Sequence, residues 1–174
     1  ELSGTANYAY RMEAMEVVLV EKGGNAPGST ENAYAEQGKK EESTGSVIYR
    51  SHVQDVGWQD WVSDGELIGT ENKAKRMEAI EIKLGDGIDG SVRYKAHVQD
   101  VGWQDWVSDG ELAGTENQAK RVEAIAIELT GAAAEKYDIY YRTHVQNFGW
   151  MGWAKNGELS GSENFGYRME GLQI

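Results

Sequence analysis

The sequence contains no cysteine, one proline and two phenylalanines among its 174 residues. The missing cysteines exclude a disulfide framework, a thiolate metal site and a cysteine nucleophile. No apolar run approaches the roughly 20 residues that a membrane-spanning helix needs. Basic residues are also few, with 17 Lys and Arg against 29 Asp and Glu and a formal charge of −12. This balance argues against nucleic acid, which needs a basic face, and against docking on anionic lipid.

The residues that are abundant favour β-structure with many turns. The chain has six Trp, nine Tyr and 22 Gly. Trp and Tyr combine an apolar ring with a polar group, so they suit half-exposed positions. Aromatic residues are enriched in strands, and glycine is enriched in the turns between them.

The sequence repeats itself, and this repeat organises the chain. Residues 49–84 and 94–129 are 36-residue blocks that differ at only seven positions, and residues 141–174 form a third, more divergent copy. The copies start 45 and then 47 residues apart. All six Trp and all three His lie at equivalent places within the copies. Each copy is therefore one structural unit, too short to bury a core alone, and the three must share one.

The repeat divides the chain into three parts. Residues 1–20 match the back half of a copy, residues 21–46 have the polar composition of a linker, and residues 47–174 hold the three copies, at 47–84, 92–129 and 139–174. Two interpretations of residues 1–20 stay open. They end a preceding set of repeats, or they close this domain by strand pairing. Because residue 1 is Glu, we expect the sequence to be an interior part of a longer protein.

Each copy is predicted to consist of short strands. Apolar and polar residues alternate strictly over residues 92–99 and 139–146, which is the pattern of a half-buried strand. Residues 58–63 are predicted to form a second short strand. In residues 77–84 the Ala, Glu and Lys favour a helix, but Ile80, Ile82 and Leu84 alternate, and we predict a strand. The expected fold is all-β, a pseudo-threefold closed repeat domain resembling a β-prism, with a β-trefoil as the alternative.

The conserved spacing within the copies carries a family resemblance. The order is Tyr-x-x-His-Val-Gln-x-x-Gly-Trp, then Trp-Val-x-Asp-Gly, then Ala/Ser-Gly-Thr, then Arg-x-Glu-Ala-Ile-x-Ile. It resembles the clostridial hydrophobic-with-tryptophan (ChW) repeat throughout residues 49–84 and 94–129, and less closely in the third copy. The resemblance implies a secreted or surface protein of Gram-positive anaerobes, with a role in adhesion or in attachment to the cell wall or to carbohydrate.

The tryptophan pairs are the first candidates for a binding site. On a regular strand a spacing of three puts the two rings of a pair on opposite faces. We therefore expect one ring in the core and one exposed, where it can stack on the apolar face of a sugar. Trp61, Trp106 and Trp153 follow polar or small residues and are the better candidates for exposure. The alternative is that both rings of each pair pack in the core.

Polar residues near these rings complete the candidate set. A His and a Gln two positions apart share one face of the first strand, and an acidic turn follows the second Trp. The acidic turn is also consistent with ordinary turn chemistry, and the His with a structural hydrogen bond. No metal and no cofactor is expected. The predicted ligand-binding residues are His52, Gln54, Trp58, Trp61, Asp64, His97, Gln99, Trp103, Trp106, Asp109, His144, Gln146, Trp150 and Trp153.

These features predict a binding module rather than an enzyme. A catalytic centre is a single asymmetric cluster, whereas these candidates recur in near-identical copies, which suits multivalent binding. We expect a non-catalytic carbohydrate or cell-wall binding module, secreted or on the cell surface. Its expected partner is a cell-wall polysaccharide or glycan, with surface proteins as a further class, and with neither nucleic acid nor membrane insertion. The alternative is a protein-interaction, adhesion or structural spacer module whose Trp residues lie in the core.

Overall fold

The computed structural model describes residues 4–6, 34–36 and 45–174. The chain divides into two compact units, Glu1–Glu42 and Ser43–Ile174. In the first unit, strands β1 (Gly4–Ala6) and β2 (Tyr34–Glu36) pair in parallel. The half copy and the linker lie largely outside the described residues, so both interpretations of residues 1–20 stay predictions.

Each copy in the second unit forms the same five strands. The long first strands are β3 (Val47–Val53), β8 (Ser91–Val98) and β13 (Tyr140–Val145). The long last strands are β7 (Met77–Leu84), β12 (Val122–Thr130) and β17 (Met169–Gln173). Between them lie β4 (Gly57–Trp58), β5 (Val62–Ser63), β6 (Ile68–Gly69), β9 (Gly102–Trp103), β10 (Val107–Ser108), β11 (Ala113–Gly114), β14 (Gly149–Trp150), β15 (Ala154–Lys155) and β16 (Ser160–Gly161). One short helix, α1 (Ala132–Lys136), precedes the third copy.

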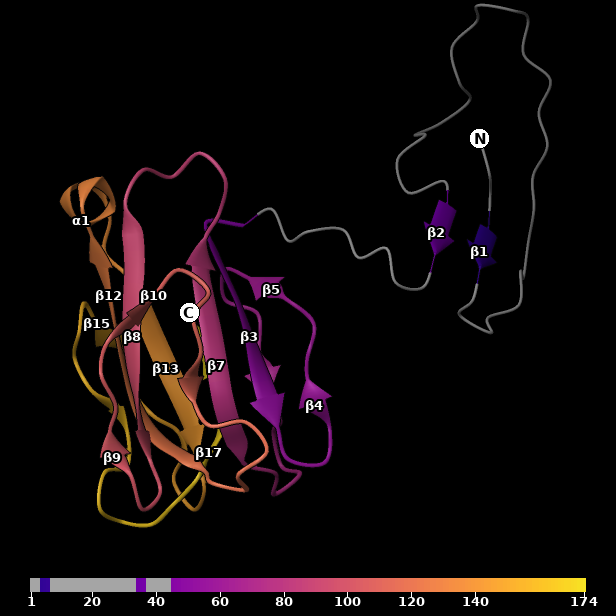
Figure 1. Ribbon diagram of the computed structural model, residues 1–174, viewed down its shortest axis with the longest axis vertical. Helices are drawn as coiled ribbons and strands as arrows, with labels where there is room; N and C mark the ends of the chain where they lie inside the picture. Colours follow the sequence, from indigo (N-terminus) through magenta and orange to yellow (C-terminus); the bar gives the residue numbers. More distant parts are fainter. Residues whose placement is uncertain (1–3, 7–33, 37–44) are drawn as a thin grey trace, which may run out of the picture. The chain divides into compact units, whose positions relative to one another are not determined.

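These strands form three antiparallel sheets of five strands each within residues 45–174 (Figure 1). The two long strands of a copy pair with each other, as β3 with β7, β8 with β12 and β13 with β17. The prediction that residues 77–84 form a strand is confirmed. The prediction of an all-β, prism-like fold with pseudo-threefold repetition is confirmed as well, because each sheet is built around one copy.

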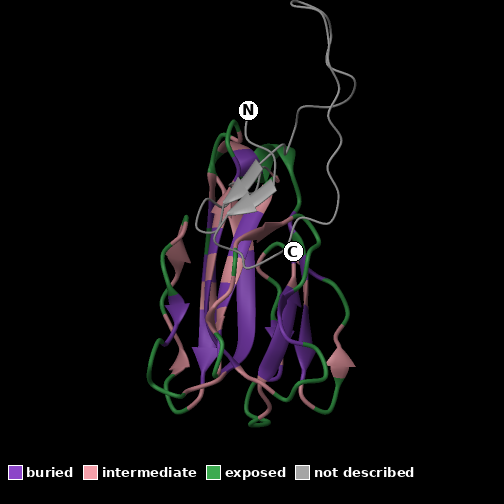
Figure 2. Ribbon diagram, turned by 90° about the vertical axis from the view of Figure 1, so that its right-hand side faces the viewer, coloured by how far each residue is buried: buried purple, intermediate pink, exposed green. Residues whose placement is uncertain are grey.

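The core lies between the three sheets and is filled by the inward side of the long strands (Figure 2). The alternation predicted for β8 holds, since Val92, Tyr94, Ala96 and Val98 are fully buried. The last strands are buried on more of their positions than a simple alternation gives. In β12, every residue from Val122 to Ile127 is buried.

The copies are joined by exchanged strands. The short strand β11 of the second copy pairs with β7 of the first, and β16 of the third copy pairs with β12 of the second. In turn, β6 of the first copy pairs with β17 of the third. Every sheet is thus completed by a strand from another copy, and the three exchanges close a ring.

Glycine makes each exchange possible. Gly69, Gly114 and Gly161 end the exchanged strands with φ values of +91°, +110° and +130°, which L side chains rarely adopt. A Cβ built on Gly114 would lie 2.4 Å from the carbonyl oxygen of Glu78 in the neighbouring copy. The backbones therefore approach too closely for any side chain.

A buried tyrosine in each first strand makes a hydrogen bond to the preceding copy in the ring. The Tyr94 hydroxyl accepts from the amide of Ile82 at 3.0 Å and donates to the carbonyl of Glu111. Tyr141 and Tyr49 make the equivalent bonds to the amides of Ile127 and Ile174, at 3.1 and 3.3 Å. All three rings are fully buried, and burial raises the pKa of each hydroxyl to about 12.

Replacing a glycine at an exchange should destabilise the whole ring. We expect Gly114→Ala to lower the free energy of unfolding by about 2 kcal/mol more than Gly87→Ala. Gly87 also has a positive φ, +80°, but nothing lies within 4 Å of its Cβ position, so it is a control for backbone strain alone. Chemical denaturation of both variants measures the difference. Equal losses would contradict the close approach.

Alkaline pH should unfold the domain through the three tyrosines. Because their folded-state pKa of about 12 exceeds the ordinary value of 10, the unfolded chain loses these protons first. The stabilisation is complete below pH 10 and is lost as the pH rises from 10 to 12. Denaturation midpoints across this range measure the fall, and Tyr94→Phe should make it shallower. Ionisation of all tyrosines near pH 10 with the fold retained would contradict this prediction.

Candidate functional site

The outer face of each sheet carries a stack of tryptophan rings and cationic side chains, which we call an aromatic–cation column. In the first copy the Arg50 guanidinium lies between Trp58 and Trp61, with its Cζ 4.6 Å from the centroid of each ring. The Lys83 ammonium covers the other side of Trp61 at 4.9 Å. The His52 ring meets Trp58 edge-on at the opposite end, with centroids 5.5 Å apart.

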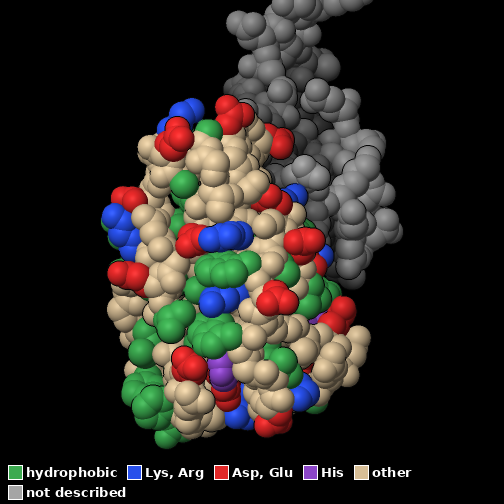
Figure 3. Space-filling view, turned by 60° about the vertical axis from the view of Figure 1, so that its left-hand side comes forward, with side chains coloured by type: hydrophobic (Ala, Val, Ile, Leu, Met, Phe, Trp, Pro, Cys, Tyr) green, Lys and Arg blue, Asp and Glu red, His purple; other side chains and the backbone are tan. Residues whose placement is uncertain are grey.

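The second copy repeats this column with one exchange of cations. Lys95 lies between Trp103 and Trp106, at 4.8 and 5.0 Å, and Arg93 covers the other side of Trp106 at 4.9 Å. His97 contacts Trp103 edge-on at 5.4 Å. Figure 3 shows a column of this kind as alternating basic and hydrophobic side chains with a histidine at one end.

The third column is open at one end. Arg142 lies between Trp150 and Trp153, at 4.6 and 4.8 Å, and His144 contacts Trp150 edge-on at 5.5 Å. Within residues 45–174 no second cation covers Trp153, which is 53% exposed. The other five tryptophans are less exposed and partly buried. Trp153 therefore offers more free ring surface than any of its equivalents.

The expectation that the two rings of a pair lie on opposite faces is wrong. It assumed that residues 58–63 form one regular strand, but β4 ends at Trp58 and β5 begins at Val62. The irregular residues between them return Trp61 to the face that carries Trp58. Neither ring enters the core, because Arg50 holds both on the outer surface.

The predicted histidines face buried carboxylates. The Nδ1 atoms of His52, His97 and His144 lie 3.0, 3.1 and 3.2 Å from Glu78, Glu123 and Glu170, without the alignment of a hydrogen bond. Each glutamate also pairs with the arginine two residues before it, as Arg76 does with Glu78 at 2.8 Å. The histidines lie on three different sheets, and the described residues contain no group of three or more His, Asp or Glu that could hold a metal ion.

The acidic turns make backbone hydrogen bonds. Asp64 accepts from the amides of Ser46 and Val47 at 2.7 and 2.8 Å, and Asp109 accepts from the amide of Val92 at 3.0 Å. Asn156 does the same for Ile139 at 2.9 Å, which explains how the third copy functions without the carboxylate. These side chains hold the start of each first strand.

The predicted glutamines occupy the turn that follows each first strand. The backbone N–H groups of Gln54, Gln99 and Gln146 donate at 3.0 Å to the backbone carbonyls of Arg76, Arg121 and Arg168 respectively. All three residues are half-buried beside the histidine end of the column. Of the predicted histidine and glutamine pair, the histidine contacts Trp58 or its equivalent, whereas the glutamine lies in the following turn.

Two features of the third copy were not predicted from the sequence. Tyr137 and Tyr140 are exposed at the end of the domain where the first strands begin. At the other end of β13, Phe148, Phe165 and Tyr167 form a cluster with ring centroids 5.7 to 6.2 Å apart. Aligning the copies gives the signal, since Phe165 and Tyr167 occupy the positions of Lys73 and Lys75. The departures of the third copy carry as much information as its matches.

Three sheets, three columns and cyclic strand exchange define a repeat module of pseudo-threefold symmetry. Comparison with protein families agrees with this geometry. The model of the family ChW, Clostridial hydrophobic W, matches residues 52–86, 97–131 and 144–174. The chain therefore belongs to the ChW family. Neither the curated proteins nor the solved structures contain a match to the chain. The described residues include no helix long and apolar enough to cross a membrane.

Removing a column tryptophan should cost less stability than removing a core aromatic. We expect Trp106→Ala to lower the free energy of unfolding by about 1–3 kcal/mol, because it removes two cation–π contacts and a half-buried ring. Tyr94→Ala should cost about 3–5 kcal/mol, because that ring is fully buried. Urea denaturation of both variants tests the order. A larger loss for Trp106→Ala would mean that the column supports the fold more than its exposure indicates.

Proposed function

We propose that this chain is a non-catalytic carbohydrate or cell-wall binding module of a bacterial protein, secreted or held at the cell surface. The observation that carries the proposal is the recurrence of one aromatic–cation column on the outer face of every sheet. Three equivalent surfaces on one rigid body suit multivalent binding to a polymer that repeats its own structure. Weak affinity at each column is then multiplied by avidity.

Each column offers both kinds of contact that a sugar needs. The half-exposed indole rings supply apolar surface for the C–H groups of a pyranose. The central cation of a column is Arg50, Lys95 or Arg142. Its N–H groups that do not point at a tryptophan ring can donate hydrogen bonds to sugar hydroxyls. In the first two copies the flanking cations cover the faces of Trp61 and Trp106. A sugar would therefore lie along the outer edge of the column there, instead of flat on one ring.

The three columns differ in charge, so we expect unequal affinities. Arg50 pairs with Glu81 at 2.6 Å, whereas Arg142 donates to the neutral Gln173 at 2.8 Å. Lys95 lies opposite Ala126, and it forms no ion pair with any described residue. The central cation is thus neutralised in the first copy and not in the other two. The affinity for a neutral glycan need not depend on this difference. A polymer with some negative charge would bind more tightly to the second and third columns.

A second candidate is a protein-interaction, adhesion or spacer module. Two observations favour it. Cations close to both Trp61 and Trp106 give these rings a structural role, and Phe148 and Phe165 are exposed in a cluster with Tyr167. Phenylalanine brings no hydrogen-bonding group to a sugar, so this cluster suits an apolar protein surface better.

Binding to purified Gram-positive cell walls, together with a glycan array, separates the two candidates. We expect Trp58→Ala, Trp103→Ala and Trp150→Ala each to weaken binding by about 1–3 kcal/mol at its own site, borrowing the scale of base–aromatic stacking. The triple variant should lose binding far more than any single one, since avidity is lost. Val56→Ala, which removes an exposed side chain outside the columns, is the control. Full binding by a correctly folded triple variant would exclude the columns and favour the protein-interaction candidate.

A further inference from the structure

The last strand of the third copy is shorter than its equivalents. Alignment of the copies places Ile174 at the position of Ile82 and Ile127. In the first two copies the strand continues beyond this position, β7 to Leu84 and β12 to Thr130, whereas the 174-residue chain stops at Ile174. In Figure 1 the C-terminus accordingly lies short of the end of the domain that the loop between β7 and β8 reaches.

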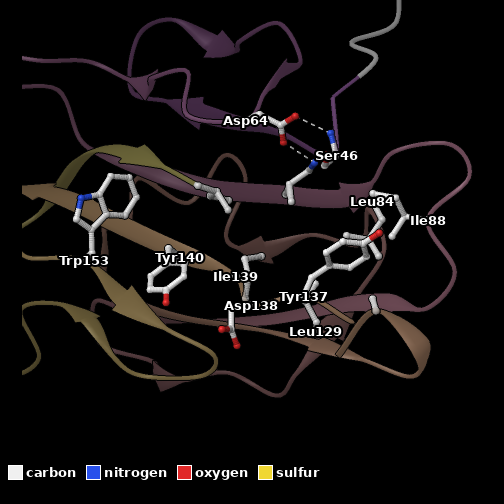
Figure 4. A pocket seen from close by; sticks show the side chains of 13 residues that line it. Ser46, Asp64, Leu84, Ile88, Leu129, Tyr137, Asp138, Ile139, Tyr140 and Trp153 are labelled. Atoms are coloured by element: carbon white, nitrogen blue, oxygen red, sulfur yellow. Dashed lines mark hydrogen bonds between the residues drawn. The ribbon is translucent and has the colours of Figure 1, made fainter. Parts of the chain in front are cut away.

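A cavity lies directly beyond the end of β17. Its volume is about 530 Å³, within the range of small-molecule sites. Its lining includes Ile174 together with Leu84 and Leu129, the residues that lie two positions beyond the equivalents of Ile174 in the other copies. In Figure 4, Trp153 lies at one end of this cavity, and Leu84 and Ile88 lie at the other. The cavity is therefore where the third last strand would continue.

The first strand of the third copy extends past the end of its partner and has free backbone groups there. β13 begins at Tyr140, but its pairing with β17 starts only at Arg142, opposite Gln173. The backbone N–H and C=O of Ile139 both bond to Asn156, on the other side of β13. Because successive residues of a strand direct their backbone groups to opposite edges, those of Tyr140 point to the β17 side. No described residue pairs with them.

The first copy shows what such backbone groups bind. Its equivalent of Tyr140 is Ile48, which pairs with Lys83 near the end of β7. The next residue of β7, Leu84, lies opposite Val47 and packs against the core. The second copy repeats this pairing between β8 and β12. An extended chain beside Tyr140 would thus form a third time what the fold already forms twice.

The uncovered face of Trp153 points to the same position. In the first copy the cation that covers the equivalent ring, Trp61, is Lys83, at 4.9 Å. In the second copy Arg93 supplies this cation from the first strand, where the third copy has Tyr140. A basic residue that is bonded through its backbone to Tyr140 would occupy the place of Lys83 and bring its charge over Trp153.

We infer that this cavity binds a partner peptide in extended conformation, which continues the line of β17 and carries a basic residue followed by an aliphatic one. The basic residue pairs with the Tyr140 backbone and covers Trp153. Because side chains alternate along a strand, the aliphatic one points inward, towards Leu84 and Leu129. The formal charge of −12 also favours a basic partner. A hydrocarbon could fill the aliphatic end but would leave the Tyr140 backbone unpaired.

A polypeptide is a different class of ligand from the glycan proposed for the columns, and the test needs no sugar. It uses the 174-residue chain and the peptide acetyl-Lys-Leu-Gly-Asp-amide, which repeats residues 83–86. We expect calorimetry to give one peptide per chain, and NMR chemical shifts to change at Tyr140, Ile174 and the Trp153 indole. Replacing the leucine of the peptide by aspartate, or methylating the backbone nitrogen of its lysine, should each weaken binding about tenfold, equivalent to about 1.4 kcal/mol.

Variants of the chain separate the two contacts. Trp153→Ala should abolish the preference for lysine over norleucine at the first position of the peptide. Trp61→Ala should keep that preference, because Lys83 of the chain itself already covers this ring. A chain extended after Ile174 by the same four residues should fill its own cavity, unfold at a higher denaturant concentration than the parent and no longer bind the peptide. Thermal melts establish that each variant is folded.

Three results would overturn the inference. The first is that the resonances of Tyr140 and Trp153 do not shift at millimolar peptide. The second is that the aspartate-containing and N-methylated peptides bind as tightly as the parent peptide, which would exclude both the aliphatic contact and the strand pairing. The third is that hexanol binds the cavity more tightly than the peptide, which would make it a hydrocarbon site. Trp58→Ala should lose cell-wall binding and keep peptide binding, so failure of one proposal is distinguishable from failure of the other.

Discussion

The exchange of short strands between copies is the contact on which the rest of the structure depends. Each exchange brings two backbones so close that only glycine fits, at Gly69, Gly114 and Gly161. Next to it, a buried tyrosine hydroxyl satisfies an amide and a carbonyl that would otherwise be left unpaired. Leaving buried polar groups without partners costs about 1–3 kcal/mol each. The ring is therefore held by directional bonds as well as by its apolar core.

This arrangement leaves the outer faces of the sheets free for other chemistry. Because the core and the exchanges stabilise the fold, tryptophan, arginine and lysine can stay half-exposed on the surface. The cations keep the rings upright and prevent them from collapsing onto each other. Trp58 and Trp150 also donate to Glu116 and Glu71, at 3.2 and 3.1 Å, so each of these columns is tied to a loop from another copy. A column is consequently a rigid surface, which lowers the entropic cost of binding.

Much of the fold could be predicted from the sequence. The threefold repeat follows from comparing the sequence with itself, and the alternation around Tyr94 and the strand at residues 77–84 follow from patterns among neighbouring residues. The exchange could not be predicted, because Ile68-Gly69 pairs with Gly171 and Leu172 about a hundred positions away. Two-residue strands have too few side chains to show a period. Their glycines look like turn residues until the opposing backbone is known.

The candidate site was predicted in part. Its tryptophans and histidines are found by recurrence, but the orientation of the tryptophans is not, because the chain is not a regular strand at Gln59. That residue bends the chain by bonding to both the amide and the carbonyl of Gly69, at 2.6 and 3.0 Å. The exposed Tyr137 and Tyr140 were missed for a different reason. The other copies have no tyrosine at the equivalent positions, so repetition gives no signal for them.

Cyclic exchange also means that the unit that repeats in the sequence differs from the unit that folds. A sheet consists of most of one copy and a strand borrowed from another, so removing one copy from a gene would leave both an unfilled sheet edge and an unpaired strand. Such edges are templates for pairing with other molecules. We therefore expect proteins built from this module to gain or lose copies in complete sets of three, and intermediate numbers to survive only when a second chain supplies the missing strand.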